Sequence, residues 1–188
     1  METKLIIIAA PSGAGKTTLC EHLLGDYSDR VLPSISCTTR SPRPGETNGV
    51  EYIFLSKTEF ENRIKEGDFI EWAEVHGNYY GTSRSVIENA ISEGKSVLLD
   101  IDVQGAKSLT QAFPDRCVTI FVSPPNMTIL EKRLRTRGTD SEEQIQKRIT
   151  NAKAEMARAN EFQHQIVNDD LARAYEQLKS ILRPVLEG

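Results

Sequence analysis

The sequence predicts an α/β fold in which a parallel β-sheet lies between two layers of helices. Three short runs, residues 5–9, 97–101 and 118–122, are almost wholly apolar and rich in branched side chains. Such runs are typical of parallel strands that helices cover on both faces. Helical patterns lie between them, so the chain alternates strand and helix as a three-layer core requires.

The helices can be placed from their apolar stripes and their end signals. The helix after the first strand is expected to end at Gly25, and a second stripe at residues 86–91 is followed by Gly94. A final helix is expected to begin near Asn168, with Pro184 limiting its regular continuation.

Two segments depart from this alternation, residues 34–82 and residues 126–148. Residues 34–82 contain Pro–Gly and Asn–Gly turn signals, short strand-like pieces and one helix at 56–66, with a capping box formed by Ser56 and Glu59 and a stop at Gly67. The predicted organisation is a core of residues 1–33, 83–125 and 149–188, a small and mostly β insertion at 34–82, and a helical lid at 126–148.

Length and composition fit one globular domain and exclude several function classes. The net charge of −4 argues against a general nucleic-acid binder, which needs a broad basic surface. Three scattered cysteines indicate reduced thiols and a cytoplasmic location. No apolar run approaches the roughly 18 residues of a membrane span, and the N-terminal apolar stretch is too short for a signal peptide.

A phosphate-binding loop follows the first strand directly and opens a helix. Its glycines allow backbone N–H groups to converge on phosphate oxygens, Lys16 reaches the β- and γ-phosphates, and the Thr17 hydroxyl can hold Mg²⁺. Alanine stands at the first pattern position, where glycine is usual. This unit predicts a P-loop NTPase core that binds ATP through Ala10, Pro11, Ser12, Gly13, Ala14, Gly15, Lys16, Thr17 and Thr18.

A basic cluster marks the predicted lid. It comprises Lys132, Arg133, Arg135, Arg137 and Arg148. Alone, such a cluster is most often a solvated helix face. Beside a phosphate loop it favours a mobile lid that neutralises charge and excludes water.

The insertion carries a second set of phosphate-binding side chains. Arg40 and Arg43 lie three apart in a turn-rich segment, and Tyr52 and Tyr80 offer hydroxyl donors. Bidentate guanidinium contacts with phenolic hydrogen bonds suit a phosphate monoester. For the arginine pair alone, simple ion pairing with nearby surface glutamates is an equal alternative.

These motifs together resemble the guanylate kinases. The matching segments are residues 11–17, 36–46, 69–72, 77–81, 99–105, 137–139 and 166–170, which follow the family's order over nearly the whole chain. The resemblance implies MgATP as donor and GMP as acceptor. It implies that Arg133, Arg137 and Arg148 close on the transferring phosphate and that Asn168 lies near the adenine.

The resemblance also implies the acceptor site. Arg40, Arg43, Tyr52 and Tyr80 would hold the GMP phosphate, with Glu46 ordering the arginines. Ser36, Glu71, Thr82 and Asp102 would read guanine. The full expected GMP set is Ser36, Arg40, Arg43, Glu46, Tyr52, Glu71, Tyr80, Gly81, Thr82, Asp100, Asp102 and Gly105.

The chemistry of Glu71 supports this assignment independently. Guanine presents N–H donors at N1 and at the 2-amino group, and a carboxylate can accept both. Adenine lacks the amino group, so the carboxylate would be left desolvated and unpaired. Phe69 and Trp72 are expected to lie beside Glu71 and exclude water.

Two aspartates follow the second apolar run. Asp100 is expected at the carboxyl end of its strand, where open α/β sheets bind ligands, and could orient Mg²⁺ or a metal-bound water. Asp102 is expected on the same strand face if the extension continues. A paired-carboxylate hydrolase is disfavoured because no suitable nucleophile accompanies the pair.

The sequence therefore predicts a kinase that transfers the ATP γ-phosphoryl group to GMP, and to dGMP, through Lys16, Asp100 and the arginines. Two alternatives are a kinase of another phosphorylated acceptor, such as a ribose bisphosphate, and a non-catalytic phosphopeptide-binding module. The expected partners are small nucleotides, with no nucleic acid and no membrane. The oligomeric state stays open, a homo-oligomer included.

Overall fold

A five-stranded parallel sheet forms the centre of the molecule. The computed structural model describes residues 3–75, 77–136, 138 and 140–187. The strand order is β2-β7-β1-β8-β9, and every neighbouring pair is parallel. The strands are β1 (Leu5–Ala9), β2 (Val31–Pro33), β7 (Ser96–Asp100), β8 (Cys117–Ser123) and β9 (His164–Val167).

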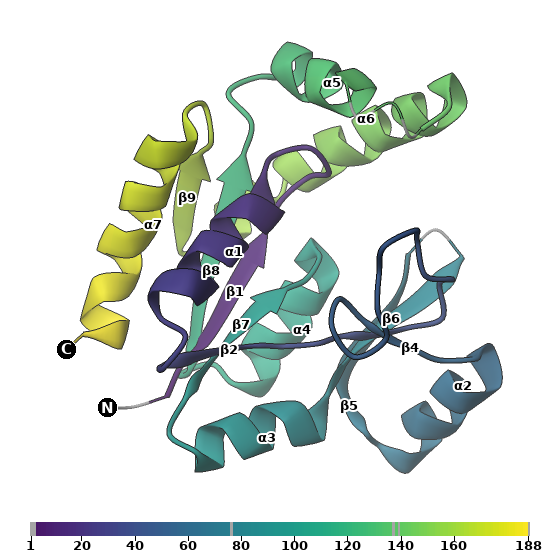
Figure 1. The fold of residues 1–188 in the computed structure, drawn as a ribbon, viewed down its shortest axis with the longest axis vertical. Helices are drawn as coiled ribbons and strands as arrows, with labels where there is room; N and C mark the ends of the chain where they lie inside the picture. The colour runs from purple at the N-terminus through teal and green to yellow at the C-terminus, as the bar shows by residue number, and fades with distance from the viewer. Residues whose placement is uncertain (1–2, 76, 137, 139, 188) are drawn as a thin grey trace.

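Helices cover both faces of this sheet (Figure 1). Ile6 and Ile8 of β1 pack in one core with α1 (Lys16–Asp26) and α7 (Leu171–Leu186). The alternate residues Leu5 and Ile7 pack in a second core with α3 (Arg84–Ser92) and α4 (Val103–Ala112). Because alternate side chains point to opposite faces, one wholly apolar strand supplies both cores. The predicted α/β fold class is confirmed.

A smaller four-stranded sheet lies in the predicted insertion. Its order is β4-β3-β6-β5, formed by β4 (Ile53–Phe54), β3 (Cys37–Thr38), β6 (Asn78–Ser83) and β5 (Phe69–Val75). Helix α2 (Lys57–Glu66) packs on it through Phe60, which stacks on Phe69 at a centroid distance of 4.4 Å. The Ser56–Glu59 capping box and the left-handed Gly67 stop are both present, as predicted.

Two helices form the predicted lid region. Helix α5 (Met127–Thr136) and α6 (Glu142–Met156) share a small apolar cluster of Leu130, Leu134 and Ala152. Helix α5 also packs on the phosphate loop, since a Cβ on Gly13 would lie 3.2 Å from Leu134 Cδ2. Helix α6 continues past residue 148, where the lid was predicted to end; the division into core, insertion and lid stays a prediction.

Three predicted helix ends were wrong. Helix α1 passes through Gly25 to Asp26, because Leu24 and Tyr27 still pack on the core at its end. Helix α7 begins at Leu171, where the Asp170 side chain caps it. It also continues beyond Pro184, since Leu186 is 2% exposed and belongs to the core. No helix in the described part of the chain is long and apolar enough to cross a membrane.

Candidate active site

The phosphate loop joins β1 to α1. Gly13 and Gly15 have φ angles of +93° and +90°, values that side chains other than glycine rarely adopt. Gly15 is the N-cap of α1, and no described side chain caps the helix there. The first amides of α1 are therefore available to an anion, and the helix dipole favours negative charge at the same place.

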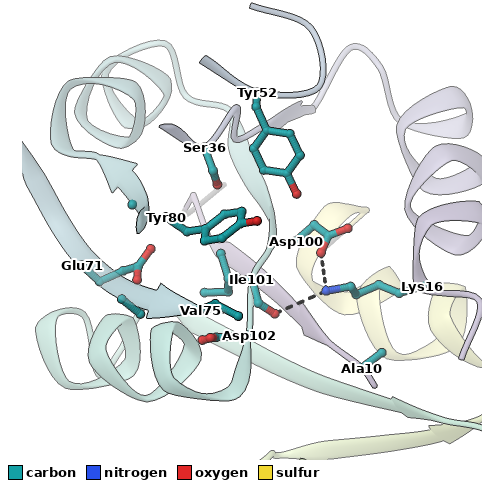
Figure 2. A pocket seen from close by; sticks show the side chains of 12 residues that line it. Ala10, Lys16, Ser36, Tyr52, Glu71, Val75, Tyr80, Asp100, Ile101 and Asp102 are labelled. Atoms are coloured by element: carbon teal, nitrogen blue, oxygen red, sulfur yellow. Dashed lines mark hydrogen bonds and ion pairs between the residues drawn. The ribbon is translucent and has the colours of Figure 1, made fainter. Parts of the chain in front are cut away.

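Lys16 extends from the first turn of α1 to the end of β7 (Figure 2). Its Nζ forms an ion pair with the Asp100 carboxylate and donates to the Ile101 carbonyl at 3.4 Å. Burial is the largest single effect and would lower the pKa of Lys16, but the charge of Asp100 and its hydrogen bond, with smaller contributions from other groups, together raise the pKa, so the ammonium stays charged. Asp100 is the last residue of β7, as predicted.

A cavity extends from Lys16 into the insertion. Figure 2 shows Ser36, Tyr52, Glu71 and Tyr80 around it. Its polar lining also includes Asp100 and Asp102, and Ala10, Ala73, Val75, Gly81 and Ile101 complete the walls. The cavity thus joins the phosphate loop to the predicted guanine-reading residues.

Glu71 is the most buried acid of this cavity, with 9% of its surface exposed. It faces Thr82 across the β5–β6 pair, and Thr82 Oγ1 donates to Glu71 Oε1 at 2.5 Å. Burial raises the pKa of Glu71, although the Thr82 hydrogen bond opposes the shift. A buried carboxylate with one oxygen engaged suits a ligand that donates hydrogen bonds.

Gly105 makes room for this carboxylate. A Cβ at position 105 would lie 2.9 Å from Glu71 Oε2. Gly105 lies in the first turn of α4, whose capping residue Asp102 accepts from the Gly105 N–H at 2.8 Å. A side chain at position 105 would therefore displace the Glu71 carboxylate from the place it occupies beside α4.

Two side-chain placements were predicted wrongly. Asp102 does not continue the strand, because β7 ends at Asp100 and Asp102 turns back to cap α4. Trp72 does not cover Glu71, since neighbouring residues of a strand point to opposite faces. Trp72 is 47% exposed and its ring contacts Tyr79 instead. Phe69, which was also predicted to lie beside Glu71, packs against Phe60 in the cluster under α2.

Arg40 and Arg43 contact one glutamate. Arg40 forms two hydrogen bonds of 2.9 Å to the Glu46 carboxylate, which also accepts from the Arg43 backbone N–H at 2.7 Å. The Arg40 guanidinium lies 5.2 Å from the centre of the Tyr52 ring. Glu46 thus orders the Arg40 side chain and the Arg43 backbone, while the Arg43 side chain is exposed.

A second pocket connects this arginine pair to the lid. Arg148 of α6 donates to Ser12 Oγ at 2.7 Å and to Asp140 at 3.2 Å. Ser12, Arg40, Arg43, Tyr80 and Arg148 all line the pocket. Positive side chains from the insertion and the lid therefore face one space beside the phosphate loop.

Arg133 and Asn168 both contact the phosphate loop at Ala14. Arg133 donates to the Asn168 carbonyl at 3.0 Å and to the Ala14 carbonyl at 3.4 Å. Asn168 is 4% exposed, and its side-chain amide donates to the Ala14 carbonyl at 2.8 Å. Its contact with adenine stays a prediction, and Arg137 lies outside the described residues.

Several residues of the second pocket were not predicted from the sequence. Gln144, Lys147, Asn151 and Glu155 line the second pocket together with Arg148. Their spacing places them on the Arg148 face of α6, a helical signal that could have found them. Burial, with a smaller contribution from Asp102, raises the pKa of Glu155 to about 7, while Lys16 opposes the shift.

Comparison with known proteins identifies the family. The family model described as guanylate kinase matches residues 2–185. This chain belongs to the guanylate kinase family. It is 51% identical over 179 residues to the guanylate kinase of Idiomarina loihiensis, covering 95% of this chain and 85% of that protein.

Other family members agree in sequence and in fold. The guanylate kinase of Maricaulis maris is 49% identical over 178 residues, covering 95% of this chain and 81% of that protein. The crystal structure of guanylate kinase from Anaplasma phagocytophilum superposes with a TM-score of 0.78 at 31% identity, covering 99% of this chain and 87% of that one. The family's fold therefore extends over nearly the whole chain.

Proposed function

We propose that this protein transfers the γ-phosphoryl group of ATP to GMP, and to dGMP, giving ADP and GDP or dGDP. One observation carries the proposal: a single cavity is lined by the phosphate-loop residue Lys16 at one end and by the buried Glu71 carboxylate at the other. Family membership supports the same reaction.

The transfer needs no general base from the protein. The acceptor is a phosphate monoester whose second pKa is about 6, so it is mostly a dianionic nucleophile at neutral pH. The work of the protein is then to align donor and acceptor and to neutralise their charge. Lys16 serves the donor phosphates, Arg40 and Arg43 serve the acceptor phosphate, and Arg133, Arg137 and Arg148 serve the group in transfer.

Mg²⁺ would be held beside Lys16. Magnesium prefers oxygen ligands and keeps several waters, and the Thr17 hydroxyl and the Asp100 carboxylate are oxygen donors that flank the loop. The donor chemistry therefore fits. When bound with ATP, the ion would neutralise charge on the phosphates, with Asp100 acting partly through water.

Base selectivity follows from the hydrogen bonds available to Glu71. Its Oε1 already accepts from Thr82, which fixes the orientation of the carboxylate. The remaining acceptor capacity matches the two adjacent N–H donors of guanine, and Ser36 lines the same cavity. Adenine would leave the buried carboxylate without a donor, which costs affinity.

The other two candidate functions lack a supporting observation. A ribose bisphosphate has no base for Glu71 to recognise. A phosphopeptide-binding module has no use for Lys16 and the open amides of the phosphate loop. We expect small nucleotides as partners and a cytoplasmic location.

A coupled assay of ADP release tests the proposed function. Turnover is measured with ATP and Mg²⁺ against GMP, dGMP, AMP, UMP and CMP. We expect GMP to give the highest kcat/KM. Lys16→Met, which keeps the length of the side chain but removes its charge, should lower turnover about 100-fold or more while remaining folded. Equal rates with all five acceptors would refute the assignment.

A further inference from the structure

Asn168 is placed directly against the phosphate loop. It follows β9, and its backbone N–H donates to the Ser123 carbonyl at 2.8 Å, which extends the pairing of β9 with β8. The buried side-chain amide then donates to the Ala14 carbonyl at 2.8 Å. Because a carbonyl can only accept, the NH₂ group and not the amide oxygen must face Ala14.

This hydrogen bond fixes the orientation of one peptide group. In a trans peptide the carbonyl and the following N–H point in opposite directions. With the Ala14 carbonyl directed at Asn168, the Gly15 N–H points away from Asn168. Gly15 is the N-cap of α1, so its N–H joins the amides at the start of that helix. The Asn168 amide therefore selects which side of the loop presents the donor.

Two further contacts hold the same arrangement. Arg133 bonds both the Ala14 carbonyl and the Asn168 carbonyl, which links α5 to the loop and to the end of β9. A Cβ on Gly15 would lie only 2.3 Å from Asn168 Nδ2. Asn168 thus occupies the space that a side chain at position 15 would need, and the two residues constrain one another.

We propose that Asn168 is a positioning residue for the phosphate loop, which holds the Ala14–Gly15 peptide so that the Gly15 N–H faces the phosphates of the donor nucleotide. Its contribution is to phosphate binding and does not depend on the base. The ligand identity rests on the proposed function, since the donor is taken to be ATP.

The test separates a phosphate effect from a base effect. Asn168→Leu removes the hydrogen bond at similar size, and Asn168→Asp replaces the donor by an acceptor. Binding of MgADP and of inorganic tripolyphosphate is measured by calorimetry or by competition. We expect both ligands to bind about 10- to 100-fold more weakly to each variant, as an unmade buried hydrogen bond implies. GMP binding should stay within about twofold, because its site lies on the other side of Lys16.

Controls and kinetics sharpen the test. Asn89→Asp, at an exposed position on α3, introduces the same charge away from the loop and should leave both affinities unchanged. In steady state, KM for ATP should rise while KM for GMP does not. Weaker ADP binding with unchanged tripolyphosphate binding would overturn the proposal and make Asn168 a base contact.

A measurement on the unmodified protein tests the proposal even if the variants fail to fold. The side-chain NH₂ of Asn168 should exchange slowly with solvent in an NMR experiment, both with and without tripolyphosphate. Rapid exchange would overturn the proposal. Failure of the proposed function is a separate outcome, in which the unmodified protein fails to phosphorylate GMP although tripolyphosphate binding still depends on Asn168.

Discussion

Glu71 shows at the residue scale how burial becomes selectivity. Its carboxylate is removed from water, and Thr82 holds one of its oxygens. A buried acceptor left without a donor is costly, so the ligand that supplies donors is strongly preferred. The adjacent Trp72 contributes nothing to this burial, because its ring points to the other face of β5.

Exchanging one oxygen of Glu71 for an NH₂ group should therefore weaken the binding of GMP without affecting the binding of ATP. In Glu71→Gln the amide oxygen can keep the Thr82 hydrogen bond, which leaves the NH₂ group facing the guanine donors. We expect kcat/KM for GMP to fall about 10- to 200-fold and selectivity over AMP to shrink, with KM for ATP nearly unchanged. The matched control Glu66→Gln, at the exposed end of α2, should behave like the parent. An equal loss on ATP would make Glu71 structural.

Glu155 predicts a pH dependence of stability. Its pKa is raised from 4.5 to about 7, so the folded protein retains a proton that the unfolded chain releases in this window. The free energy of unfolding should therefore fall as pH rises between these values. Glu155→Gln removes the ionisation and should stabilise the fold by about 1 kcal/mol at about pH 8, allowing for solvent screening, with no gain at about pH 4. Urea unfolding at both pH values measures this, and a gain of equal size at both would contradict it.

At the scale of elements, the site depends on how closely α4 approaches β5. Gly105 faces Glu71 across this contact, and a Cβ there would displace the carboxylate. Asp102 caps α4 and fixes where the helix starts. This in turn fixes the position of Gly105, in the first turn of the helix, relative to Glu71. Helix α4 thereby positions an acid that belongs to the insertion.

Gly105→Ala should separate stability from function. Alanine favours a helix over glycine by up to about 1 kcal/mol, so the variant should stay folded. The added methyl group should push Glu71 aside and lower kcat/KM for GMP about tenfold or more, with KM for ATP unchanged. The matched variant Gly25→Ala lies in α1, where a Cβ meets nothing within 4 Å, and should keep full activity. Full activity of Gly105→Ala would show that Glu71 needs no such space.

At the scale of the whole molecule, the fold brings positive side chains together from segments that are far apart in the sequence. Arg40 comes from the insertion, Arg148 from α6 and Arg133 from α5, and all three lie near the phosphate loop. Holding such a cluster together is unfavourable unless anions are bound. Closure of the insertion and of α5–α6 should therefore be coupled to binding of both nucleotides.

A distance measurement tests this closure. The three cysteines are buried, so fluorescent labels can be placed on cysteines introduced in α2 and α6. We expect the label distance to shorten when a bisubstrate analogue binds, with opening and closing on roughly the μs to ms scale. ATP alone should give a smaller change. An unchanged distance in the saturated protein would exclude closure of these elements.

Signals carried by a few neighbouring residues could be read from the sequence. The apolar runs appear as buried strands, and the capping box at Ser56 and the left-handed Gly67 are present. The positions of Lys16 and Asp100 followed from one strand–loop–helix unit and from the end of one strand. The failure at Pro184 arose where packing on the rest of the molecule decided a helix end. The direction of Trp72, in contrast, follows from the local alternation of side chains along β5, which turns it away from Glu71.

The sequence by itself determined the α/β class and the phosphate loop, because hydrophobic period, glycine conformation and capping act over a few residues. The resemblance to the family added the acceptor. Only the tertiary structure decided that Gly105 admits Glu71 and that Asn168 holds Ala14 across 154 residues of chain. Such contacts depend on where packed elements bring distant side chains, and no local pattern specifies that position.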